Sequence, residues 1–433
     1  MRFLHVADVH LDSPCSSRSE RVRQKLRDAS RLAFQRLVDL ALAEGVDAVL
    51  IAGDLFDDER LSFQTERFLL EQIHRLDAEC IPFVYATGNH DPGRAGLRSV
   101  ELAWPSSVTV ARDRTAVRIT IESVDRESGT REVRGVVTAV GHETGAEEGD
   151  LSTVFPTPEG PLPEIAVLHT QVVDSPGSAA HQRYAPSQLE GLEKSGHDYW
   201  ALGHVHKRSA LCDHPGIHYP GNLQGRTHGE RGPKGCLLVD VHPGRPPDVE
   251  FKKLAPIQWE DVEIRDPSEA TTLDALIETI AEGWESVAGG DAETDWIGRI
   301  RVSGATPLWR ELSGDDDQDH LREELVYRLG LLDLTLEIGS VYPEVRADEH
   351  LMRVDVLGET LRLVNAIRAG SIGGSVGGGV AAGGGRAGLT GLSPEQLIGL
   401  DEPERLHEYV AELLDTGEAE VLSRMLKSVA EDR

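Results

Sequence analysis

The sequence predicts a mixed α/β domain followed by a small α+β domain, and three observations support this fold class. Over the first ninety residues, short apolar runs alternate with segments whose apolar residues recur at helical spacing. After Ser107 the pattern changes to short alternating runs that are typical of strands. After Pro256 the composition changes again, and a chain of 433 residues is long enough for two or three domains.

The first domain, which we place at residues 1–255, begins with strand–helix–strand order. Helices are expected between Val22 and Leu40, where apolar residues recur three or four apart, and over residues 66–76. Strand–helix alternation predicts a parallel sheet covered by helices, and such sheets bind ligands beyond the carboxyl ends of their strands. The expected strands are residues 2–7, 46–52, 81–86, 165–168, 199–202, 235–241 and 249–254.

The second domain is expected at residues 256–368 and carries no histidine cluster, so we interpret it as a cap or substrate-selecting module. The run Asp315-Asp316-Asp317 is expected to be a solvated loop rather than a cation site. The expected elements are helices over residues 273–287 and 320–329 and strands over residues 297–302 and 332–338.

The last part of the chain is predicted to be a linker followed by two short helices. Residues 369–388 contain ten glycines, which indicates a flexible connection. Ser393-Pro394 is typical of a helix start, and apolar stripes follow within residues 389–433. Two short helices cannot build much of a core alone, so they could dock on the body of the protein or on a helical partner.

The net charge of −30 limits the classes of partner. A strong acidic excess repels polyanions at long range and argues mildly against nucleic acid; adaptation to a salt-rich cell interior is one hypothesis for it. The chain has no apolar run of eighteen residues and no signal-peptide layout at its start, so we expect a cytoplasmic protein. Its four cysteines lack the spacing of zinc knuckles or disulfide frameworks.

Five short segments, each after a predicted strand, carry side chains that bind metals. They are Asp8-Val9-His10, Gly53-Asp54-Leu55-Phe56-Asp57, Gly88-Asn89-His90-Asp91, His169 and Gly203-His204-Val205-His206. Each is weak alone, but together they indicate a two-metal site. Two divalent ions about 3.5–4 Å apart can hold a phosphate and activate a water between them. Imidazole and carboxylate ligands suit manganese, iron or zinc better than calcium.

The residue types also suggest a role for each ligand. A carboxylate must bridge two ions that lie so close, and Asp54 is the expected bridge. The first ion would take Asp8, His10 and His206, and the second would take Asn89, His169 and His204.

Several nearby residues are expected to act around the metals. His90 is interpreted as a catalyst that contacts the phosphate and protonates the leaving oxygen, with Asp91 or Asp57 to orient it or a ligand. His142 is expected not to be a ligand. Substrate contacts are expected from Lys207 and Arg226, and also from Arg208 and Lys234. The helix face that carries Arg23, Arg27 and Arg31 could meet phosphates or pair with neighbouring acids.

The five segments resemble the signature of calcineurin-like metallophosphoesterases. Residues 3–14, 199–208, 219–226 and 232–236 are similar to SbcD-type DNA repair exonucleases, in particular the YhaO-like branch. The resemblance implies a four-layer α-β-β-α sandwich with a cap domain and a manganese-dependent nuclease that acts on DNA ends. It also implies a partner, a coiled-coil ATPase of the SbcC or Rad50 kind, held by the C-terminal helices, and a homodimer formed through the phosphoesterase domains.

Two other functions compete with a DNA exonuclease or endonuclease of double-strand break repair. The same metal set serves phosphodiesterases that act on nucleotides or other small phosphoesters, although those enzymes rarely need a second domain and tethered helices. The chain could also be a scaffold with a vestigial site, but the complete ligand set and His90 argue against that.

Overall fold

The computed structural model describes residues 1–16, 18–57, 61–93, 102–124, 130–177, 182–289 and 294–343, together with Met352, Val354, Gly358, Leu361 and Arg362. The expected linker at 369–388 and the expected helices within 389–433 lie outside the described residues. The chain divides into two compact units, one with residues 1–260 and 291–297 and the other with residues 261–290 and those from 298 onward.

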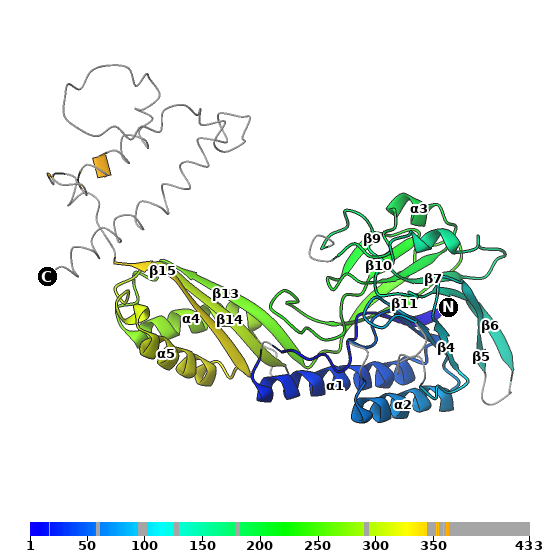
Figure 1. Cartoon of the computed structure of the whole chain (residues 1–433), viewed down its shortest axis with the longest axis horizontal. Helices are drawn as coiled ribbons and strands as arrows, with labels where there is room; N and C mark the ends of the chain where they lie inside the picture. The colour runs from blue at the N-terminus through cyan, green and yellow to red at the C-terminus, as the bar shows by residue number, and fades with distance from the viewer. Residues whose placement is uncertain are drawn as a thin grey trace, which may run out of the picture. The chain divides into compact units, whose positions relative to one another are not determined.

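The first unit contains two six-stranded sheets (Figure 1). The first sheet has the order β12-β11-β1-β2-β3-β4 and the second has the order β5-β6-β7-β8-β10-β9. The strands of the first sheet are β1 (Arg2–Val6), β2 (Ala48–Ala52), β3 (Phe83–Ala86), β4 (Val108–Ala111), β11 (Gly235–Asp240) and β12 (Asp248–Lys253). Those of the second are β5 (Val117–Val124), β6 (Arg131–Val140), β7 (Glu164–His169), β8 (Tyr199–Gly203), β9 (Ser209–Cys212) and β10 (Gly216–Tyr219).

Helices cover the outer face of each sheet, so the unit has four layers (Figure 1). Helices α1 (Glu20–Glu44) and α2 (Phe63–Ala78) pack on β1, β2 and β3, with Phe34 and Leu69 among the core residues of this layer. The short helices η1 (Leu151–Val154) and α3 (Leu189–Glu193) cover the second sheet around Trp200. Successive side chains of a strand point to opposite sides of its sheet. Each sheet therefore packs one face against its helices and the other face against the second sheet, where the core includes Phe3 and Tyr199. The predicted α/β sandwich is confirmed.

The two sheets place the carboxyl ends of their parallel strands at one edge. Strands β1, β2, β3 and β4 are parallel to one another, as are β6, β7 and β8. The buried side chain of His5 joins the sheets: its Nδ1 lies 2.9 Å from the Tyr199 hydroxyl, and its Nε2 lies 3.0 Å from the Leu202 carbonyl oxygen. The loops after the parallel strands of the first sheet therefore lie close to the loops after the parallel strands of the second sheet.

The second unit contains a three-stranded sheet of the order β13-β14-β15, in which β13 and β14 continue from the first unit. The elements are β13 (Ile257–Arg265), α4 (Leu273–Ala288), β14 (Asp295–Ala305), the short helix η3 (Glu311–Ser313), α5 (Asp315–Arg328) and β15 (Asp333–Tyr342). Trp284 of α4 and Leu325 of α5 are buried.

One sequence prediction in this unit is wrong. Asp315-Asp316-Asp317 is not a loop but the first turn of α5, which begins five residues earlier than expected. Carboxylates near a helix N-terminus interact favourably with the backbone N–H groups there, so the acidic run starts the helix. The helix buries only Leu321 and Leu325 and therefore shows a weak apolar pattern.

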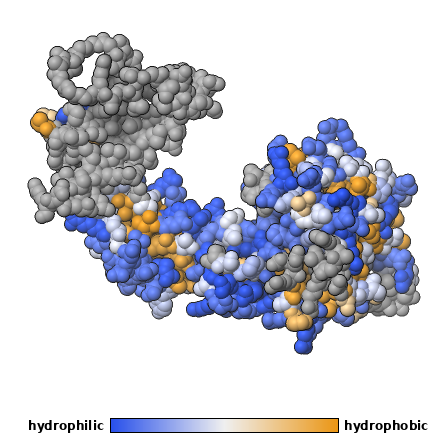
Figure 2. Space-filling model, in the orientation of Figure 1, coloured by the Kyte–Doolittle hydropathy of each residue, from blue (hydrophilic) through white to orange (hydrophobic). Residues whose placement is uncertain are grey.

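The described surface is mostly hydrophilic. Hydrophilic residues cover most of the described face visible in Figure 2. Within the described ranges, every helix is too short or too polar to cross a bilayer.

His5 gives the fold a testable pH dependence. Burial lowers the pKa of His5 from 6.5 to about 3, so the folded protein keeps this ring neutral while the unfolded chain protonates it near pH 6.5. Stability is therefore lost as the pH falls below 6.5, and at pH 5.5 the loss from His5 should reach about 1.4 kcal/mol. Urea unfolding in EDTA at pH 7.5 and 5.5 should show a smaller acid loss for His5→Gln than for the wild type. Equal losses in the two proteins would rule out this role.

Candidate metal centre

The backbone after β1 and β2 is bent sharply at the candidate metal-binding residues. Asp8, His10 and Asp54 have positive φ values of 52°, 49° and 52°, which is uncommon for residues with a Cβ atom. The two loops are held together by backbone hydrogen bonds from Asp8 N to Gly53 O (3.1 Å) and from His10 N to Asp54 O (3.0 Å). Such conformations persist where the surroundings fix them, and they gather at functional sites.

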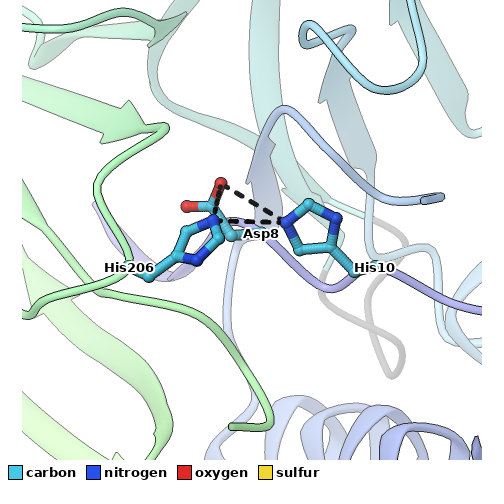
Figure 3. A group of neighbouring side chains, drawn as sticks. All are labelled: Asp8, His10 and His206. Carbon is cyan, nitrogen blue, oxygen red and sulfur yellow. Dashed lines mark hydrogen bonds and ion pairs between the residues drawn. The ribbon is translucent and has the colours of Figure 1, made fainter. Parts of the chain in front are cut away.

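Asp8, His10 and His206 form one set of converging side chains (Figure 3). His10 Nε2 lies 3.3 Å from His206 Nε2, and Asp8 Oδ1 lies 3.6 Å from His206 Nε2 and 4.0 Å from His10 Nε2. Asp8 and His10 are completely buried. Two ring nitrogens and a carboxylate oxygen therefore face a common point.

Asn89, His169 and His204 form a second set. Asn89 Oδ1 lies 2.9 Å from His169 Nε2 and 3.0 Å from His204 Nδ1. His204 is also tied to the loop after β1, because its backbone N–H donates to the Asp8 carboxylate at 3.1 and 3.2 Å.

Asp54 lies between the two sets. Its Oδ2 atom is 3.8 Å from His10 Nε2 in the first set and 3.5 Å from His169 Nε2 in the second. Its other oxygen, Oδ1, accepts a hydrogen bond from the His90 backbone N–H at 2.9 Å. One carboxylate thus faces both groups of ring nitrogens.

The electrostatics of these residues suit divalent cations. Burial raises the pKa of Asp54 to about 6. Burial also raises the pKa of Asp8, but the hydrogen bond and charge of His206 outweigh it and leave that pKa below its ordinary value. Burial keeps the pKa of His10 well below its ordinary value, which leaves a neutral ring with a lone pair. Carboxylates together with imidazole rings are the donor set that manganese, iron or zinc prefers.

His206 differs from His10 because it carries a proton in the absence of an ion. Burial lowers the pKa of His206, but hydrogen bonds to Asp8 and Glu230 outweigh burial and raise the pKa to about 9. Metal binding at Nε2 must therefore release a proton, as is usual for histidine ligands.

His90 lies beside the two sets, and its side chain is 43% exposed. Its Nδ1 atom is 3.2 Å from Asp57 Oδ1, and Asp57 Oδ1 is also 2.8 Å from His10 Nδ1. Of the two carboxylates considered in the sequence, it is therefore Asp57 that contacts the His90 ring.

Asp91 has a different position, although it adjoins His90 in the sequence. Its buried carboxylate accepts hydrogen bonds from the backbone N–H groups of Gly88 (2.7 Å), Asp54 (3.2 Å) and Phe56 (3.1 Å). Asp91 thus fixes the backbone of the loops that carry Asp54 and Asn89.

The expected substrate-binding residues have separate positions. Lys207 is exposed, and the exposed Arg208 places its guanidinium over the Phe251 ring. Lys234 is buried and donates to the His206 carbonyl oxygen at 2.8 Å. Arg226 has a side chain only 15% exposed and contacts Asp57 and Glu230. Of these residues, only Lys207 and Arg208 are open to solvent.

Two other groups of residues from the sequence analysis have partners within the chain. On α1, Arg23 and Arg27 pair with Glu20, and Arg31 pairs with Asp28, so this face is paired with acids. His142 is buried, and its Nε2 lies 2.7 Å from the His169 carbonyl oxygen, so it supports the strand end.

Glu230 is the site residue that the sequence did not reveal. Its Oε1 lies 2.7 Å from His206 Nδ1, and its Oε2 accepts a hydrogen bond from Asn222 at 3.0 Å. Glu230 follows no predicted strand and belongs to no metal-binding motif, so only the folded chain brings it to His206.

Comparisons with known proteins agree with this geometry. Residues 1–208 match the calcineurin-like phosphoesterase family, and residues 259–334 match the middle domain of metallophosphoesterase YhaO. The uncharacterized metallophosphoesterase YhaO of Bacillus subtilis is 32% identical, and the alignment covers 71% of this chain and 73% of that protein. The chain belongs to the calcineurin-like phosphoesterase family. It is therefore a metal-dependent phosphoester hydrolase.

Two more distant relatives of this phosphoesterase carry names from DNA metabolism. The DNA double-strand break repair protein Mre11 of Methanopyrus kandleri is 27% identical over 66% of this chain and 61% of its own length. A component of the nuclease SbcCD from Rhodobacter capsulatus is 27% identical over 57% of this chain and 68% of its own length.

The phosphoesterase site should not tolerate a side chain at Gly53. A Cβ atom there would lie 2.2 Å from His169 Nδ1, so Gly53→Ala must displace this ring. We expect hydrolysis of bis(p-nitrophenyl) phosphate with Mn²⁺ to fall at least about 100-fold, the scale of a misplaced catalytic centre.

Gly45→Ala is the matched control, because Gly45 also has a positive φ but a Cβ atom there would have no neighbour within 4 Å. It should cost about 1–2 kcal/mol of stability and leave hydrolysis unchanged. If Gly53→Ala and Gly45→Ala hydrolysed the substrate at similar rates, the position of the His169 ring would not be required for hydrolysis.

Proposed function

We propose that this phosphoesterase is a two-metal phosphodiesterase, and that its substrate is DNA. The observation that supports two ions is the position of Asp54 Oδ2, which lies within 4 Å of a ring nitrogen from each set. Asp8, His10 and His206 would hold one ion, and Asn89, His169 and His204 the other, with Asp54 shared. We infer Mn²⁺ from the mixed imidazole and carboxylate donors, with Fe²⁺ or Zn²⁺ as alternatives.

The ions, when bound, would supply charge stabilisation and a water of lowered pKa. The chain's own residues would do the rest. His90, exposed beside the ligand sets, is placed to contact a phosphate oxygen and to give a proton to the leaving oxygen. Asp57, 3.2 Å from His90 Nδ1, would orient that ring so that its Nε2 faces the substrate. Asp91 would act only through the backbone that it holds.

Three observations support DNA as the substrate. Relatives named for double-strand break repair and as part of a nuclease align with more than half of the chain. Lys207 follows the ligand His206 directly and is exposed, as a phosphate contact requires. The second unit and the C-terminal segment that the sequence predicts exceed what a small phosphoester needs. The net charge of −30 favours the alternative, a phosphodiesterase for nucleotides or other small phosphoesters.

Cleavage of end-labelled duplex DNA with Mn²⁺ tests the proposal. The wild type should shorten the duplex, and His90→Ala should cleave about 10²–10⁴-fold more slowly, because it loses a proton donor. His74→Ala, which changes an exposed histidine of α2, should cleave like the wild type. Hydrolysis of cyclic nucleotides without any wild-type cleavage of DNA would support the alternative and contradict the proposal.

We further propose that the chain works as a homodimer with a coiled-coil ATPase of the SbcC or Rad50 kind. Residues 389–433 would bind the coiled coil, because the two amphipathic helices that the sequence predicts there could pack on one. A chain that ends at residue 388 should keep its phosphodiesterase activity and no longer co-purify with the ATPase. Unchanged co-purification would contradict this assignment of the segment.

A further inference from the structure

We propose that Arg226 is a positioning residue that clamps the histidines of one metal half-site and the catalytic His90 into a single unit. This inference rests on the proposed metal ligands and deepens the account of that site. It assigns to Arg226 a role other than the substrate contact expected from the sequence, and it gives Glu230 a part in the site.

The two ligand sets are supported in different ways. In the second set, His169 Nδ1 lies 2.9 Å from the Ala52 carbonyl oxygen, and His204 Nε2 lies 2.9 Å from the Gln182 carbonyl oxygen. Both rings are therefore oriented by neutral backbone groups.

In the first set, a carboxylate lies beside Nδ1 of each ring. His10 Nδ1 lies 2.8 Å from Asp57 Oδ1, and His206 Nδ1 lies 2.7 Å from Glu230 Oε1. A carboxylate on one ring nitrogen fixes the proton there, directs the other nitrogen to the ion and makes it a stronger donor. The orientation of this half-site thus depends on two side chains rather than on backbone groups.

Arg226 joins those two carboxylates. One guanidinium nitrogen donates to Asp57 Oδ1 at 3.0 Å, and the other donates to Glu230 Oε1 at 3.3 Å. The backbone N–H of Arg226 also donates to Glu230 Oε2 at 2.6 Å. The rigid fork of a guanidinium suits such paired contacts with carboxylates. Through Asp57, which also contacts His90, the same guanidinium reaches the proposed catalyst.

The surroundings of Arg226 disfavour a direct role in binding phosphate. Its side chain is 15% exposed, and those of Asp57 and Glu230 are 9% and 10% exposed. The positive charge therefore lies between two largely buried negative charges, and a phosphate would have to compete with both. Removal of the guanidinium would leave these carboxylates close together without their shared cation, which is costly in a buried position.

The test is a titration of the metal-free, full-length protein with Mn²⁺. The electron paramagnetic resonance signal of free Mn²⁺ measures how much of the ion is bound. The wild type should bind two ions. Arg226→Met should bind one of them about 10–100-fold more weakly and the other unchanged, because carboxylates that orient ligands typically contribute this much. Glu230→Gln should weaken the same ion. Arg226→Lys keeps the charge but loses the fork, and it should fall between Arg226→Met and the wild type.

Arg299→Met is the matched control, because Arg299 also pairs with two carboxylates, Asp261 and Glu337, but lies in the second unit. It should bind both ions like the wild type, while thermal melting reports the stability of every variant. With bis(p-nitrophenyl) phosphate, Arg226→Met should lower kcat and recover part of it at high Mn²⁺ concentration.

Unchanged Mn²⁺ binding by Arg226→Met with a raised KM and unchanged kcat would overturn the proposal and make Arg226 a substrate contact. Equal weakening of both ions in a folded variant would also overturn it. The titration contains no substrate, so a failure of the wild type to cleave DNA would reject the proposed substrate and leave this test intact.

Discussion

The candidate metal centre is built around two buried carboxylates. Asp8 and Asp54 are 0% and 1% exposed, and they present oxygens within 4.8 Å of one another beside His169. Two negative charges so close together are unfavourable away from water. Imidazole rings and backbone N–H groups of the chain stabilise them, and the arrangement of the donors is suited to cations. The raised pKa of Asp54 and the lowered pKa of Asp8 show the two carboxylates in unequal surroundings.

The fold supplies these neighbours because two sets of parallel strands end at the same edge. The first sheet delivers Asp8, Asp54 and Asn89, and the second delivers His169 and His204, each from the end of a strand or the loop after it. Hydrogen bonds that cross between the sheets, such as those from His204 N to the Asp8 carboxylate, hold the loops in place. The site depends on strand ends of both sheets, so it forms only when the whole sandwich does.

The sequence predicted the strands and helices of the first unit well, because strand runs and helical periods are local patterns. The side chains that it proposed as ligands lie close together in the structure, where strand ends of both sheets meet. The sequence predicted the contacts of individual side chains less well where neighbours in the chain are not neighbours in space. Asp91 adjoins His90 but holds backbone groups, whereas Asp57, thirty-three residues earlier, contacts the His90 ring. Glu230 and the burial of Arg226 depend on tertiary contacts that no spacing rule encodes. The start of α5 was missed because a short, acidic first turn carries no apolar signal.

Anomalous diffraction from crystals grown with Mn²⁺ would test the central claim most directly. The account predicts two anomalous peaks about 3.5–4 Å apart, with Asp54 between them. One peak should contact Asp8, His10 and His206, and the other Asn89, His169 and His204. A single ion, or two ions without a shared contact to Asp54, would contradict the account.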